Sequence, residues 1–164
     1  MMMMAAAVLC GSATAETLGD MIRQAGWNKI IGTWVDADTK GENIRVKYAW
    51  KYKDHAIQVT SKLGEVQSTG LIGRNAATGE VFMTGVNSEG GATLGKWIEE
   101  DGDAVLETGF VSGDGEEGVM RIRHHLKDDN TMVITIPRED AEPITLTLVR
   151  QAAPKKEKAN KKEQ

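Results

Sequence analysis

The sequence predicts an all-β protein, an antiparallel up-and-down barrel of about ten strands with one short N-terminal helix. Three observations predict it: polar and apolar residues alternate with a period of two from Gly32 onward, turn residues separate nearly every pair of apolar runs, and the connections are short. Short connections favour antiparallel neighbours, because parallel strands need long crossovers. Ten short strands in one domain must either close into a barrel or form two stacked sheets, so a β-sandwich is the alternative.

The first 15 residues have the pattern of a signal peptide. An apolar stretch over residues 1–9 is followed by Ala13-Thr14-Ala15, a cleavage site of small residues. We therefore expect a mature chain that starts near Glu16 and is periplasmic or secreted. Cys10, the only cysteine, would be removed, so the mature domain would have neither disulfides nor cysteine catalysis. The alternative is that these residues form a buried strand or helix.

One short helix is expected directly after this segment. Thr17 and Asp20 have the spacing of a capping box. Gly26 can end the helix. Between them runs an apolar stripe at helical spacing, formed by Leu18, Met21, Ile22 and Ala25.

Residues 16–150 are expected to form the barrel domain. The clearest alternation runs from Ile44 to Lys51, where every second residue is apolar. Glycines in the middle of strands suit the bends of a small closed barrel better than a sandwich. They are Gly70, Gly85, Gly95 and Gly109. The expected strands are 32–36, 44–51, 56–63, 65–72, 80–86, 92–99, 104–111, 118–126, 131–136 and 144–150.

The distribution of charge excludes some partners. The chain carries a formal charge of −4, but its last 14 residues hold five lysines and only two acids, so residues 1–150 carry −7. An acidic body does not favour nucleic acid, whose phosphates require a positive surface. Residues 151–164 are expected to be a disordered Lys-rich tail. No apolar run of 18 residues follows the N-terminus, so no membrane span is expected.

Two features resemble the lipocalin and calycin pattern. Gly32-Thr33-Trp34 is a G-x-W on the first expected strand after a short helix, and Arg150 closes the last strand on its apolar face. In that family a first-strand Trp packs beneath a last-strand Arg at the closed end of the barrel. The resemblance therefore implies that Trp34 and Arg150 are a structural pair, with the cation stacked on the ring.

The stretch from Ile30 to Arg150 is also similar to an uncharacterised lipocalin-like domain of secreted bacterial proteins. The shared motifs are Gly32-Thr33-Trp34-Val35, Tyr48-Ala49-Trp50, and Ser88-Glu89-Gly90-Gly91 continuing to Gly95-Lys96-Trp97. No activity is assigned to that domain. The resemblance therefore implies the fold and not the function.

Four residues are candidates for an interior binding site, because parity places them on the inner face of their strands. They are Tyr48, Trp50, Trp97 and His124. Thr93 and Gly95, small residues on the face of Trp97, would leave space beside the indole. Aromatic rings with one polar group in an apolar pocket are typical of a small-molecule site. We therefore expect the barrel to bind a small apolar molecule.

Three alternatives remain open at this stage. The four residues could simply fill a core, which would make the protein a ligand-free structural or interaction domain. His124 could ligate haem, although the glycine-rich signature of ten-stranded haem barrels does not follow Trp34. His124 could also serve as the acid or base of an enzyme. Neither the ligand nor the oligomeric state follows from the sequence.

The sequence contains no recognisable catalytic set and no metal site, so none is predicted. His124 and His125 point to opposite faces of one strand and cannot chelate one ion together. The segment Asp36-x-Asp38-x-Lys40-Gly41 begins like a calcium loop but has lysines where ligands are needed, so it is interpreted as a turn. No nucleophile elbow and no phosphate-binding loop is found. An enzyme is therefore the less favoured class.

Overall fold

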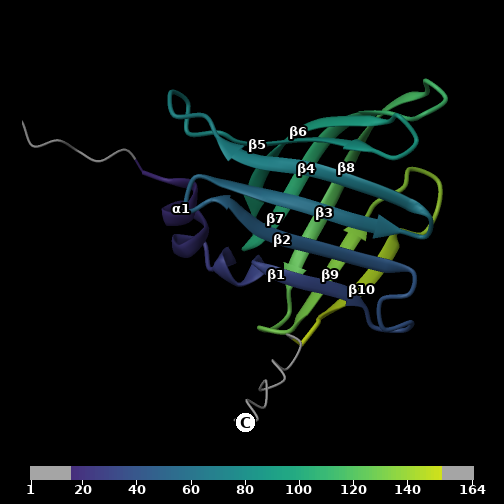
Figure 1. Ribbon diagram of the computed structural model, residues 1–164, viewed down its shortest axis with the longest axis horizontal. Helices are drawn as coiled ribbons and strands as arrows, with labels where there is room; N and C mark the ends of the chain where they lie inside the picture. Colours follow the sequence, from purple (N-terminus) through teal and green to yellow (C-terminus); the bar gives the residue numbers. More distant parts are fainter. Residues whose placement is uncertain (1–15, 153–164) are drawn as a thin grey trace, which may run out of the picture.

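The computed structural model of the protein describes residues 16–152, so the predicted signal peptide and nearly all of the predicted tail lie outside the described residues. One α-helix and one 3-10 helix precede ten strands (Figure 1). Their bounds are α1 Leu18–Gln24, η1 Trp27–Ile30, β1 Gly32–Asp36, β2 Ile44–Tyr52, β3 Ala56–Leu63, β4 Val66–Arg74, β5 Val81–Asn87, β6 Ala92–Glu100, β7 Asp103–Val111, β8 Glu117–Leu126, β9 Thr131–Ile136 and β10 Ile144–Arg150.

The predicted fold class is confirmed. Every neighbouring pair of strands is antiparallel, and the sheet closes in the order β1-β10-β9-β8-β7-β6-β5-β4-β3-β2. Closure joins the first strand to the last, with Trp34 opposite Arg150 and Asp36 opposite Leu148. The sheet is therefore a barrel and not the sandwich that the sequence left open. Among residues 16–152, no helix is both long and apolar enough to span a bilayer.

The capping box predicted for α1 is confirmed. The Thr17 hydroxyl accepts the N–H of Asp20 at 3.1 Å, and the Asp20 carboxylate accepts the N–H of Thr17 at 3.0 Å. Gly26 follows the helix with a φ of 75°, a conformation that glycine adopts without strain. The 3-10 helix η1 was not predicted, since four residues are too few to show a period.

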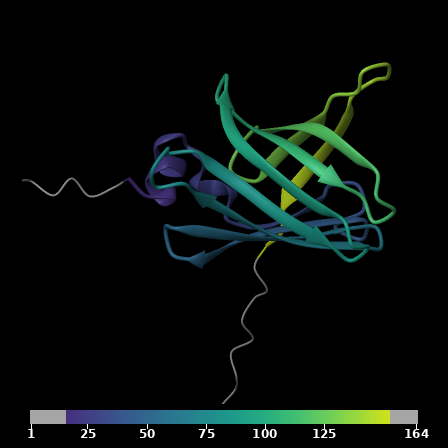
Figure 2. The same ribbon diagram turned by 90° about the horizontal axis from the view of Figure 1, so that it is seen from above.

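The two helices lie at one end of the barrel (Figure 2). The N–H of Gly19 donates to the carbonyl of Asp54 in the β2–β3 turn at 2.9 Å, and Arg23 pairs with the Asp54 carboxylate at 2.8 Å. A Cβ on Gly19 would lie 2.2 Å from an Asp54 oxygen, so only glycine permits this approach. Leu18, the first residue of α1, is buried and belongs to the hydrophobic core. These contacts hold α1 over the end of the barrel.

Trp34 and Arg150 lie together where β1 meets β10. The Trp34 ring is fully buried and donates its Nε1–H to the carbonyl of Ile30 at 2.8 Å. The Arg150 guanidinium lies over this ring, 4.4 Å from its centroid. It also donates to the carbonyls of Ile31 and Asp129, each at 2.9 Å. The Arg150 side chain thus connects the β1–β10 junction with the end of the 3-10 helix and with the β8–β9 turn.

Two of the mid-strand glycines give a matched test of packing between β6 and β7. A Cβ on Gly95 would lie 2.4 Å from the carbonyl oxygen of Glu107, which is backbone and cannot move aside cheaply. We expect Gly95→Ala to lower the free energy of unfolding by about 1–3 kcal/mol, as overpacking does. On Gly109 the nearest atom would be 3.9 Å away, so Gly109→Ala is the control and should not destabilise the protein. Urea denaturation measures both variants, and equal losses would contradict the prediction.

Candidate functional site

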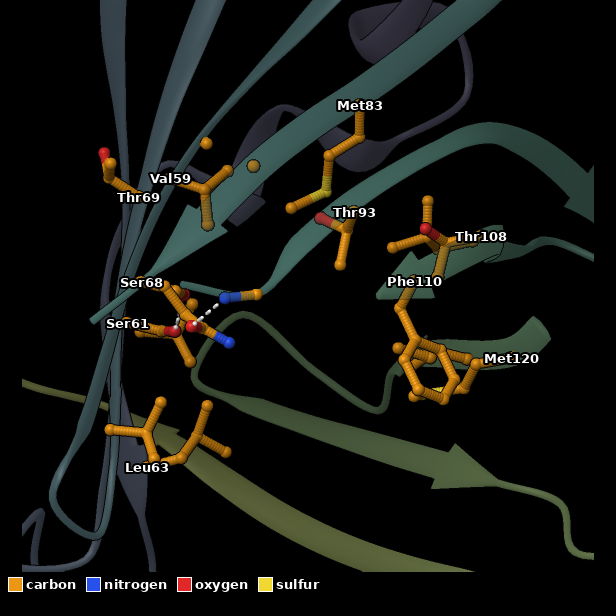
Figure 3. Close-up of a pocket in the computed structure, with 18 of the residues that line it drawn as sticks. Val59, Ser61, Leu63, Ser68, Thr69, Met83, Thr93, Thr108, Phe110 and Met120 are labelled. Carbon is orange, nitrogen blue, oxygen red and sulfur yellow. Dashed lines mark hydrogen bonds between the residues drawn. The ribbon is translucent and has the colours of Figure 1, made fainter. Parts of the chain in front are cut away.

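The interior of the barrel contains a cavity of about 410 Å³, lined by side chains from β2 to β10 (Figure 3). Its rim includes Leu63 and Val66 beside the β3–β4 turn, Gly91 in the β5–β6 turn and Ser112 in the β7–β8 turn. These turns lie at the end opposite α1, because α1 is held by the β2–β3 turn. The cavity therefore reaches from the open end of the barrel inward.

The lining of this cavity is uncharged. Among the described residues, no Asp, Glu, Lys or Arg contributes to it. Its polar groups are mostly hydroxyls, and those of Ser61 and Ser68 bond each other at 2.6 Å. The rest is apolar, and Figure 3 shows Met83, Phe110 and Met120 facing the space. Such a lining suits a molecule without formal charge.

Three of the four predicted site residues line the interior cavity, and one does not. Tyr48, Trp97 and His124 all contribute to its wall. Tyr48 is buried, and burial raises the pKa of its hydroxyl, so the ring stays neutral. Trp50 does not line the cavity: it is half-buried and packs against the core, with the Lys53 ammonium 5.5 Å from its ring centroid. The four residues are therefore not one cluster.

Trp97 and His124 meet at the inner part of the cavity. Their ring centroids are 4.9 Å apart, with the planes inclined at 58°. His124 is 5 % exposed, and its Nδ1 lies 3.3 Å from the carbonyl oxygen of Ile122. Burial among apolar side chains lowers the pKa of His124 to about 4. The imidazole is therefore neutral at pH 7 and adds no charge to the cavity.

The indole Nε1–H of Trp97 is buried and has no hydrogen-bond partner among the described residues. An unsatisfied buried donor costs about 1–3 kcal/mol. Trp97 also lines a second cavity of about 510 Å³ beneath α1, so it contributes to both spaces.

Sequence reasoning missed the space beneath the helix and the tryptophan that bounds it. Trp27 lies on η1, is buried, and donates its Nε1–H to the carbonyl of Gly102 at 3.3 Å. It was missed because it lies outside both periodic patterns. Phe110 and Met83 were missed as lining residues too, although a period of two along their strands could have identified them.

No candidate metal site lies in the described part of the chain. Nowhere between residues 16 and 152 do three or more His, Cys, Asp or Glu side chains come together as they would around a metal ion. His125 lies outside the barrel with Nδ1 2.7 Å from an Asp103 oxygen, and Arg123 binds the other oxygen of that carboxylate at 2.9 Å. The Asp36 carboxylate is occupied by the turn itself, accepting N–H groups of Thr39 and Ile44.

No model of a known protein family matches this chain, and no curated protein sequence is significantly similar to it.

Proposed function

We propose that this protein binds a small, uncharged and largely apolar molecule inside its barrel. The observation that carries the proposal is a cavity of about 410 Å³ that lacks Asp, Glu, Lys and Arg among its described lining residues. This volume falls within the range of small-molecule sites, roughly 300–1,000 Å³. We further propose, from the signal-peptide pattern, that binding takes place outside the cytoplasm, as in the lipocalin-like domains that the sequence resembles.

The chemistry of the lining argues for a neutral ligand. An ion placed in the cavity would lose its hydration and find no opposite charge there, which is strongly unfavourable. His124 cannot supply that charge at pH 7, because its pKa is lowered to about 4. The hydroxyls of Thr93 and Thr108 offer hydrogen bonds to a neutral oxygen or nitrogen.

A pair of matched probes tests the charge preference. N-phenyl-1-naphthylamine is neutral and apolar, and 1-anilinonaphthalene-8-sulfonate is the same skeleton with a sulfonate. We expect the neutral probe to bind at least about tenfold more tightly, a difference of about 1.4 kcal/mol. Fluorescence titration of both probes measures it. Equal affinities would contradict the uncharged site.

Tryptophan emission locates the bound probe. Trp97 lines the interior cavity, whereas Trp50 lines neither cavity and serves as the matched control. We expect the neutral probe to quench emission in the native chain and in Trp50→Phe, and to lose most of that quenching in Trp97→Phe. Unchanged quenching in Trp97→Phe would place the probe outside the cavity.

Native mass spectrometry of the protein exported by a bacterial host then tests for a natural ligand. A reproducible non-covalent adduct would support a carrier, and its mass would distinguish haem from an apolar guest. An empty protein that binds neither probe would contradict the proposal and favour the ligand-free domain.

A further inference from the structure

Strand β8 has a free edge over part of its length. β8 pairs with β7 from Glu117 to His124, but its pairing with β9 covers only Arg123 to Leu126. Residues 117–121 therefore have no strand beside them on the β9 side among the described residues. Pro137 directly follows β9 and cannot donate to a ladder, so the pairing cannot continue.

This edge is accessible. The β7–β8 and β9–β10 hairpins project from the same end of the barrel and lie apart from each other in both views (Figures 1 and 2). A groove of about 620 Å³ separates residues 119–121 from residues 137–139. The Arg138 guanidinium turns back to the carbonyl of Glu142 at 2.8 Å and does not cover the strand. The backbone N–H and C=O groups that face the groove are thus open to another strand.

One uncharged row with exposed apolar side chains crosses the outer face next to the edge. Val119, at the centre of the free segment, is 90 % exposed. It lies opposite Gly109 on β7, and Gly109 lies opposite Leu94 on β6, which is 69 % exposed. The same row of the sheet continues to Thr84 and Leu71 without a charged side chain. Exposed apolar side chains grouped on one face are typical of an interaction site.

We propose that two copies of the chain pair through the free edges of β8, antiparallel and with Val119 opposite Val119 of the second copy. In this register Glu117 lies opposite Arg121 of the second copy, and Arg121 lies opposite its Glu117. Opposite charges directly across two strands stabilise the pair, and like charges destabilise it. A parallel arrangement in register would place like charges together. The charges of Glu117 and Arg121 therefore favour pairing with a second copy of the chain, antiparallel and in this register.

The expected product is a reversible dimer with one sheet continuous through both barrels. The apolar row of each barrel then extends into that of the other, from Leu94 through Val119 to the Val119 and Leu94 of the second copy. The interface is small, because each copy contributes only five residues of strand, so dimerisation should depend on protein concentration. The free segment borders the interior cavity through Met120, but the pairing uses only backbone groups at the strand edge and side chains on the outer face.

Sedimentation velocity over a range of concentrations tests the proposal on the full chain. We expect the native chain to dimerise and Val119→Lys to remain a monomer, because two lysines would face each other at the symmetry axis. Val119 is so exposed that this change removes little internal packing, and circular dichroism checks that the fold is kept. Tyr52→Lys is the matched control, since Tyr52 is 65 % exposed on β2. It should still dimerise.

A charge exchange tests the register. Glu117→Arg and Arg121→Glu each place like charges across the interface, so each variant alone should be monomeric. Their equimolar mixture restores opposite charges at both positions and should form a heterodimer. Arg121→Glu also removes internal ion pairs with Glu100 at 2.8 Å and with Glu107 at 3.6 Å, so its fold is checked separately. A native chain that stays monomeric, a Val119→Lys dimer, or a mixture that fails to associate would each overturn the proposal.

Discussion

Replacing Trp34 with alanine is expected to lower the free energy of unfolding by about 3–5 kcal/mol, the range seen for large aromatic truncations in cores. The ring is fully buried at the seam between β1 and β10. Its loss would leave a cavity, remove the hydrogen bond to the Ile30 carbonyl, and take away the surface on which Arg150 lies. Urea denaturation of the native and variant chains measures the loss.

Trp50→Ala provides the control for this prediction. Trp50 is the same residue type in the neighbouring strand β2, but it is only half-buried and holds no hydrogen bond that closes the barrel. We expect a clearly smaller loss than for Trp34→Ala. Equal losses would show that a tryptophan at the junction of β1 and β10 contributes no more to stability than a half-buried tryptophan elsewhere in the barrel.

Acid is expected to destabilise the protein through His124 well before most carboxylates titrate. Its pKa falls from 6.5 to about 4 in the folded state, because the buried ring cannot be hydrated when charged. Between these values the unfolded chain binds a proton that the folded chain does not, so stability falls as the pH falls from 6.5 towards 4. A shift of this size corresponds to about 3 kcal/mol, present above pH 6.5 and lost near pH 4.

His124→Phe isolates this effect, because it keeps an aromatic ring beside Trp97 and removes the titrating group. Urea denaturation at pH 7, 5.5 and 4.5 should show a steep loss for the native chain and a shallower one for the variant. Carboxylates with lowered pKa values, such as Asp20 with its Thr17 bonds, contribute mainly below pH 4. Parallel curves for the two proteins would contradict a neutral buried His124.

The strands were predictable because each carries its own signal. Ile44 to Trp50 alternates cleanly, and β2 is found there, extending to Tyr52. The ends of several strands differ from expectation by one or two residues, as for β4, which continues to Arg74 past the expected end at residue 72. Strand ends depend on the neighbouring strand, since β4 is extended where Arg74 finds Val81 of β5 opposite. That partner is not visible in the local pattern.

The candidate site was predictable only where the alternation of side chains along one strand determines which residues face the interior. Parity gave Tyr48, Trp97 and His124 their inward direction. It did not show that Trp50 lies away from the cavity: Trp50 is paired with the buried Ile57 and packs against the core at the end of the barrel where α1 lies. The space beneath α1 and the free edge of β8 arise from how distant elements meet. Only the assembled barrel reveals them.

The junction of β1 and β10 also governs when the barrel can form. Arg150 donates to the carbonyl of Ile31 across 119 residues of chain, so the first strand synthesised is completed by the last. At about 5–20 residues per second, a ribosome needs roughly ten seconds between the two. During that interval β1 has an unpaired edge, and contacts so distant in sequence form slowly. A nascent chain stalled within β10 would therefore have an open sheet, because the barrel closes only when the final strand is available.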